Sequence, residues 1–65
     1  MQITVNGEAR TTQAETLDDL CRELGLMEAK IATARNGAFV TAKERGRVSL
    51  EDGDTIEILS PRQGG

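Results

Sequence analysis

Histidine, tryptophan and tyrosine are absent from this sequence, and there is a single cysteine. One cysteine cannot form a disulfide within the chain, and without histidine it does not suffice for a zinc or haem site. The chain also has no nucleophile paired with a histidine, no phosphate-binding glycine-rich loop and no cluster of convergent acid–base groups. We therefore expect a protein that binds no metal or cofactor and is not itself an enzyme.

Aromatic residues and positive charge are scarce as well. Phe39 is the only aromatic side chain, and the formal net charge is −3. Nucleic-acid binding needs basic residues near the phosphates and usually aromatic rings on which bases stack. No apolar run approaches the roughly 20 residues of a membrane span, and the first residues lack the layout of a signal peptide. These absences predict no nucleic-acid partner, no membrane partner and a cytoplasmic location.

The 65 residues suffice for one domain of modest stability, because a chain this short buries only about 60% of its unfolded surface. Apolar residues make up 37% of the sequence and charged residues 29%, which is typical of a folded globular protein. Pro61 has no N–H to donate and therefore ends the last strand. We expect a domain over residues 1–60 and a flexible tail over residues 61–65.

The first half of the chain predicts a hairpin followed by a helix. Residues 2–6 alternate between polar and apolar, as in a half-buried strand, and Asn6-Gly7 favours a type I′ turn into an antiparallel strand at 8–12. A helix should then begin after Thr16, a good N-cap, and end at Gly25. Its apolar stripe consists of Leu17, Leu20, Cys21 and Leu24.

The second half predicts more strands and no further helix. Residues 31–35, the turn Asn36-Gly37 and a strand starting at 39–41 form a second hairpin. Residues 48–50 return apolar side chains to the core, and the last strand covers 55–60. Four or five strands with one short helix imply an α+β fold, in which a mixed sheet wraps around the helix. The other face of the sheet is left for water or a partner.

Two apolar side chains have alternative interpretations. Alternation places Leu59 on the face opposite to Ile56 and Ile58, either in a docking patch or as an isolated exposed leucine. Phe39 either packs at the edge of the core, which we favour, or contacts a partner.

Cys21 and the acidic cluster at 51–54 have a chemical interpretation and a structural one. Cys21 lies on the apolar stripe of the helix, so we expect it to pack in the core rather than to relay sulfur. For the cluster of Glu51, Asp52 and Asp54 we expect turn chemistry, in which the two aspartates hydrogen-bond nearby backbone amides, rather than a cation site or a match to a basic partner.

The sequence ends in Gly64-Gly65. Two residues without a Cβ can enter a channel too narrow for other residues, and Gly65 presents a carboxylate there. The alternative is a frayed end. Extended, residues 61–65 would reach roughly 17 Å, enough to enter a partner's active site. Arg62 pairs with an acidic channel mouth or is a solvated charge.

An N-G-x-x-V segment at 36–40 and an L-x-D-G-D segment at 50–54 precede the terminal Gly64-Gly65 in this order. Together with residues 3–8 and the helix start at Thr16-Leu17, they resemble the ThiS family, the bacterial sulfur carriers of thiamine biosynthesis. The resemblance covers nearly the whole chain and implies a ubiquitin-like β-grasp fold.

The resemblance also implies a chemistry for the tail. A carboxylate with a pKa near 3.5 resists nucleophilic attack, so an E1-like enzyme, ThiF, would adenylate Gly65 with ATP and magnesium. A persulfide from a cysteine desulfurase would then leave a thiocarboxylate, and the thiazole synthase ThiG would accept the sulfur. Gly64, Gln63, Arg62, Leu59 and Phe39 are the expected partner-binding residues. Residues 60–62 depart from family tails, which often carry apolar residues there.

Other functions fit the same residues. The sulfur acceptor would instead be molybdopterin, a thiolated tRNA base or a sulfur-containing natural product. A ubiquitin-like modifier that joins Gly65 to lysines is a further alternative, as is an interaction module in which Gly64-Gly65 is accidental.

Overall fold

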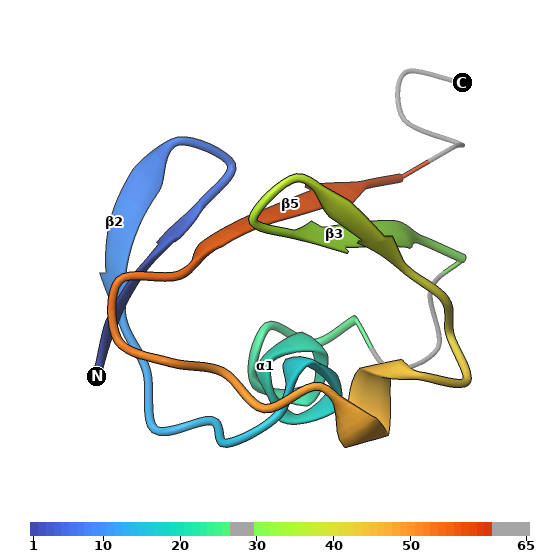
Figure 1. Ribbon diagram of the computed structural model, residues 1–65, viewed down its shortest axis with the longest axis horizontal. Coiled ribbons are helices and arrows are strands. Elements are labelled where there is room, and N and C mark those ends of the chain that lie inside the picture. Colours follow the sequence, from blue (N-terminus) through green and yellow to red (C-terminus); the bar gives the residue numbers. More distant parts are fainter. Residues whose placement is uncertain (27–29, 61–65) are drawn as a thin grey trace.

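A five-stranded mixed sheet lies over one helix in the computed structural model, which describes residues 1–26 and 30–60 (Figure 1). The strand order is β2-β1-β5-β3-β4, with β1 and β5 parallel and all other neighbours antiparallel. The expected α+β architecture is confirmed. The elements are β1 (Gln2–Val5), β2 (Glu8–Thr11), α1 (Leu17–Glu23), β3 (Ala32–Arg35), β4 (Ala38–Val40), the 3₁₀ helix η1 (Arg45–Arg47) and β5 (Thr55–Leu59).

Both hairpins turn at an Asn-Gly pair, as expected. Asn6 and Asn36 each have φ of 51°, and Gly7 and Gly37 each have φ of 86°. Two successive positive φ angles define the type I′ turn, whose twist matches that of the flanking strands.

Helix α1 begins and ends where its capping residues predict. The Thr16 hydroxyl accepts a hydrogen bond from the Asp19 N–H at 3.1 Å, which satisfies one of the free amides of the first turn. Gly25 has φ of 78°, and the Leu26 N–H after it donates to the Cys21 carbonyl at 2.8 Å. No helix in the described ranges has the length and apolarity needed to cross a membrane.

The core lies between α1 and the face of the sheet that is turned toward it. Cys21 is 2% exposed, and this burial raises the pKa of its thiol, so its expected packing role is confirmed. The buried apolar side chains are Ile3, Ala14, Leu17, Leu20, Cys21, Val40, Leu50, Ile56 and Ile58.

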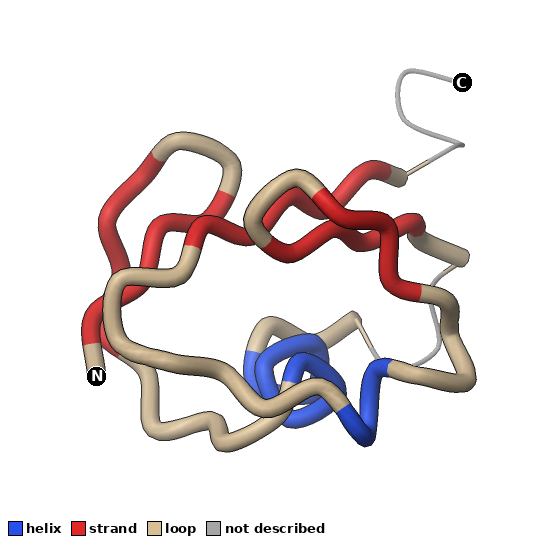
Figure 2. The backbone as a smooth tube through the Cα atoms, in the orientation of Figure 1, coloured by secondary structure: helices blue, strands red, loops and turns tan. Residues whose placement is uncertain are grey.

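Residues 48–50 lie between η1 and β5 and are not a strand of the sheet. Val48 and Leu50 are half-buried and buried, as expected, but the segment passes beside α1 (Figure 2). The Val48 carbonyl accepts from the Leu17 N–H at 3.0 Å, and the Leu50 N–H donates to the Glu15 carbonyl at 2.9 Å. These backbone groups therefore form hydrogen bonds with residues at the start of the helix instead of with a strand of the sheet.

Candidate functional site

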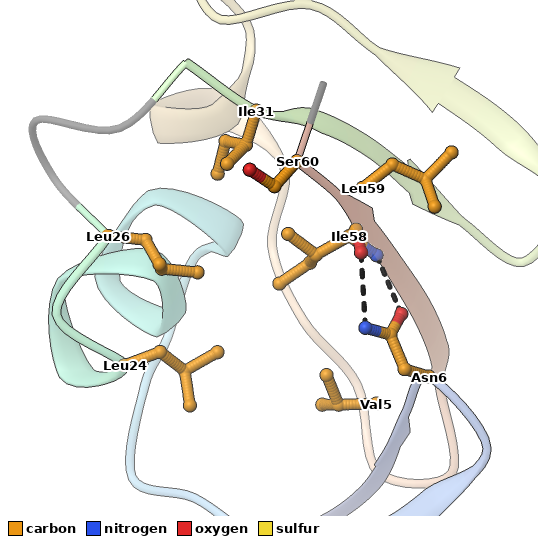
Figure 3. Close-up of a pocket in the computed structure, with 8 residues that line it drawn as sticks. All are labelled: Val5, Asn6, Leu24, Leu26, Ile31, Ile58, Leu59 and Ser60. Atoms are coloured by element: carbon orange, nitrogen blue, oxygen red, sulfur yellow. Dashed lines mark hydrogen bonds between the residues drawn. The ribbon is translucent and has the colours of Figure 1, made fainter. Parts of the chain in front are cut away.

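The side chains of strand β5 alternate between the core and the outer face of the sheet. Ile56 and Ile58 are buried, whereas Thr55, Glu57 and Leu59 are exposed. Leu59 is 69% exposed and points to the opposite side of β5 from Ile58 (Figure 3). The predicted outward position of Leu59 is confirmed.

Phe39 also lies outside the core, with 67% of its surface exposed. The favoured interpretation, that it packs at the edge of the core, is therefore wrong. Val40 pairs with the buried Thr33, so it is Val40 that faces inward, and its neighbour Phe39 must face outward because side chains alternate along a strand.

The register of the sheet brings Phe39 and Leu59 to the same face. Phe39 lies opposite Ala34, and Leu59 lies opposite Ala32, so the two large side chains flank two small ones on β3, the strand between β4 and β5. We call these four residues the open-face patch. Sequence reasoning missed the two alanines, although their alternation with the buried Thr33 was a usable signal.

Ser60, the residue before the tail, lines a pocket of about 530 Å³. We call Ser60 the root of the tail. Leu24 and Leu26 follow α1 on one side of it, and Ile58 contributes from the sheet (Figure 3). Residues 61–65, which include the expected site residues Arg62, Gln63, Gly64 and Gly65, lie outside the described residues, and their roles stay predictions. The pocket is lined by Val5, Asn6, Leu24, Leu26, Ile31, Ile58, Leu59 and Ser60.

Both aspartates before β5 accept hydrogen bonds from backbone amides: the partner of Asp54 is nearby in the turn, as expected, whereas the partner of Asp52 lies in β1. Asp52 Oδ1 accepts from the Gln2 N–H at 2.8 Å, and Asp54 Oδ2 accepts from the Glu51 N–H at 2.8 Å. In the part of the chain that the structure describes, no three His, Cys, Asp or Glu side chains are grouped to hold a metal ion.

Asp54 has a second set of partners that the sequence did not reveal. Its carboxylate accepts from Arg35 Nε at 2.7 Å and from Asn36 Nδ2 at 3.0 Å. Burial alone would raise the pKa of Asp54, but the hydrogen bonds from Arg35, the Glu51 amide and Asn36, together with the charge of Arg35, outweigh it and lower that pKa. Asp54 therefore joins the second hairpin to the turn before β5 as an ionised group.

The sequence model of the ThiS family matches residues 3–65. The chain belongs to the ThiS family. It is 30% identical over 63 residues to the sulfur carrier protein ThiS of Thermus thermophilus, an alignment that covers 97% of this chain and 98% of that protein.

Solved structures and longer proteins also resemble this ThiS-family chain. The crystal structure of the thiamine biosynthesis protein ThiS from Geobacter metallireducens superimposes with a TM-score of 0.83 at 29% identity, over 100% of both chains. The expected ubiquitin-like β-grasp fold is thereby confirmed. The thiazole synthase of Paramagnetospirillum magneticum is 36% identical over 66 residues, which cover 100% of this chain and 20% of the synthase. The chain thus spans about a fifth of the length of the first curated relatives that it matches.

Proposed function

We propose that this chain carries sulfur for the thiazole ring of thiamine, as a thiocarboxylate on Gly65. The observation that carries this proposal is the alignment with a sulfur carrier protein, which covers 97% of this chain and 98% of that carrier. The likeness to a solved ThiS over the full length of both chains adds support. In this function the chain is a cosubstrate, and turnover belongs to its partners.

The proposed chemistry has an activation step and a sulfur-transfer step. An E1-like enzyme similar to ThiF uses ATP and magnesium. It joins the Gly65 carboxylate to the AMP moiety of ATP and releases pyrophosphate. A persulfide supplied through a cysteine desulfurase attacks the acyl carbon and displaces AMP, and a thiol then cleaves the S–S bond to leave the thiocarboxylate. The dependence on ATP favours a cytoplasmic location.

The acceptor of the sulfur is proposed to be a ThiG-like thiazole synthase. Two thiazole synthases contain a region that matches this chain at 36% and 38% identity. The matched region occupies 20% and 18% of those proteins, so a domain of this kind is covalently joined to each synthase. This arrangement supports a functional connection between the two.

The open-face patch is the proposed docking surface for the partner enzymes. Phe39 and Leu59 are 67% and 69% exposed on the face of the sheet that α1 does not cover. Leu59 ends β5 and is separated from the tail by Ser60 alone. A partner that covers the patch would hold the body while residues 61–65 enter its active site.

Replacing both large side chains of the patch, Phe39→Ser with Leu59→Ser, is expected to weaken docking. The concentration of carrier that half-saturates the activating enzyme should rise about tenfold, because apolar anchors at the centre of an interface contribute most of its binding energy. The unfolding temperature should hardly change, since both side chains are exposed. Steady-state rates of adenylation at varied carrier concentration measure the effect.

Thr11→Ala is the matched control for the patch variant, because Thr11 is exposed at the far edge of the same sheet in β2. Its half-saturating concentration should equal that of the wild type. An unchanged half-saturating concentration in the double variant would rule out the patch as the docking surface.

The intact mass of the protein tests the proposed function directly. The chain is incubated with ATP, magnesium, an E1-like enzyme and a persulfide donor. We expect a mass gain that corresponds to the replacement of one oxygen by sulfur. An unchanged mass, with the enzyme shown to be active on another carrier, would overturn the proposal, and high-mass lysine conjugates would identify a protein modifier instead.

A further inference from the structure

The side chain of Asn6 continues the pairing of β1 with β5 after β1 itself has ended. The Asn6 N–H donates to the Ile56 carbonyl at 2.9 Å, and the backbone then turns away at Gly7. The side-chain amide takes over: its oxygen accepts from the Ile58 N–H at 2.8 Å, and its nitrogen donates to the Ile58 carbonyl at 3.1 Å (Figure 3). Asn6 thus satisfies both the N–H and the C=O of Ile58, which in a longer parallel β1 would be bonded by the backbone groups of two different residues.

Asparagine suits this position for two independent reasons. It adopts the left-handed conformation, φ of 51°, more readily than other residues with a side chain. Its amide also carries a donor and an acceptor side by side, which matches the N–H and C=O of one strand residue. Aspartate keeps the acceptor and lacks the donor, and glycine keeps the backbone conformation and lacks both.

Asn36 has the same turn geometry but holds the opposite end of β5. It also has φ of 51°, and its side-chain oxygen accepts from the Thr55 N–H at 2.9 Å. Its amide nitrogen donates to Asp54 at 3.0 Å. The two Asn-Gly turns therefore bind β5 at its first residue and at Ile58, two residues before Ser60.

We propose that Asn6 is a positioning residue for sulfur transfer, because it fixes the direction in which the chain leaves β5 toward Gly65. This inference rests on the proposed function. Without the Asn6 amide, the end of β5 is held only from the β3 side, where Leu59 pairs with Ala32. Ser60, the residue before the tail, can then move more freely on the side of β5 that faces away from β3, where β1 has already ended.

A small change of direction at the root of the tail has a large effect at its end. When a partner holds residues 61–65 fully extended, over roughly 17 Å, a rotation of about 10° at Ser60 would move the last residue by about 3 Å. A misplacement of about 1 Å can reduce a reaction rate about 100-fold. Because the proposed docking surface is the open-face patch and does not include Asn6, the loss should affect the maximal rate rather than the affinity for the partner.

The test compares Asn6→Gly with Asn36→Gly. Each variant keeps its turn, because glycine adopts positive φ, and each loses two side-chain hydrogen bonds near β5. Thiocarboxylate formation is followed by intact mass at a temperature at which circular dichroism shows all proteins folded. For Asn6→Gly we expect an about tenfold lower maximal rate with a half-saturating concentration within about twofold of the wild type. For Asn36→Gly both values should stay within about twofold.

Two further measurements separate positioning from simple loss of stability. Amide hydrogen exchange at Leu59 and Ser60 should be faster in Asn6→Gly and unchanged in Asn36→Gly. Asn6→Asp, which keeps the acceptor for the Ile58 N–H, is a milder variant whose rate should fall between those of the wild type and Asn6→Gly.

The possible outcomes distinguish this inference from the proposed function. If the wild type gains no sulfur with a competent enzyme, the proposed function is wrong and the inference falls with it. If the wild type is active and the two glycine variants lose the same fraction of their maximal rate, Asn6 is only structural. A wild-type maximal rate in Asn6→Gly would also overturn the inference.

Discussion

Deletion of Gly65 is expected to abolish thiocarboxylate formation while the domain unfolds at the wild-type temperature. The remaining carboxylate, on Gly64, would stop about 3.4 Å short of the position from which the carboxylate of Gly65 attacks the α-phosphate of ATP. The buried core residues of the described chain all lie at or before Ile58, so folding should not depend on Gly65. Intact mass after incubation with ATP, magnesium, enzyme and persulfide donor measures the first effect, and thermal unfolding measures the second.

Ser60→Ala is the matched control, because Ser60 is exposed next to the tail and its replacement alters neither the length of the tail nor its carboxylate. This variant should gain the mass of the wild type, at a rate within a few-fold of it. Retention of the mass gain after deletion of Gly65 would show that sulfur is attached elsewhere and would refute the assignment of the reacting carboxyl.

The parts of the fold that the sequence predicted well depend on local interactions. The turns at Asn6-Gly7 and Asn36-Gly37 follow from the φ angles that these pairs favour. The start of α1 follows from Thr16, whose hydroxyl bonds an amide three residues along the chain. Such preferences act within a few residues, so they can be recognised before any tertiary contact is known.

The parts that the sequence did not predict depend on contacts between distant segments. The return of Val48 and Leu50 to the core was predicted, but not that their backbone groups pair with residues 15 and 17 at the start of α1. In the three-residue strand β4, alternation alone does not decide whether Phe39 or Val40 faces inward, and only the pairing with β3 decides it. The bonds between Asn6 and Ile58 join residues that are 52 positions apart. The contacts of the strand end before the tail were therefore not predictable from the sequence, and the roles of the terminal residues stay predictions.

The largest effect on stability is expected from Asp54→Asn. Asp54 is 6% exposed and accepts hydrogen bonds from the Arg35 side chain at 2.7 Å, the Asn36 side chain at 3.0 Å and the Glu51 N–H at 2.8 Å. An amide of the same shape directs its NH₂ group at one of these donors and leaves the charge of Arg35 without a carboxylate. Because hydrogen bonds to charged groups are strong, the free energy of unfolding at pH 7 should fall by about 2 to 3 kcal/mol.

A loss of this size should be visible in a protein of 65 residues, whose total stability is expected to be only about 3 to 10 kcal/mol. Urea unfolding followed by circular dichroism measures it. Asp52→Asn is the matched control, because Asp52 is exposed and accepts a single hydrogen bond, from the Gln2 N–H at 2.8 Å. Its effect should be about 1 kcal/mol or less.

The pH dependence of the difference between wild type and Asp54→Asn identifies its cause. The hydrogen bonds from Arg35, Glu51 and Asn36 lower the pKa of Asp54 in the folded protein despite its burial, so the folded state binds the proton less readily than the unfolded state. The stabilisation is therefore fully present above the ordinary value of 3.8 and is lost as the pH falls through the lower folded pKa. The two unfolding free energies should converge on acidification below that value. A difference that stays constant down to the acid limit would show that the shape of the side chain, rather than its charge, stabilises the turn before β5.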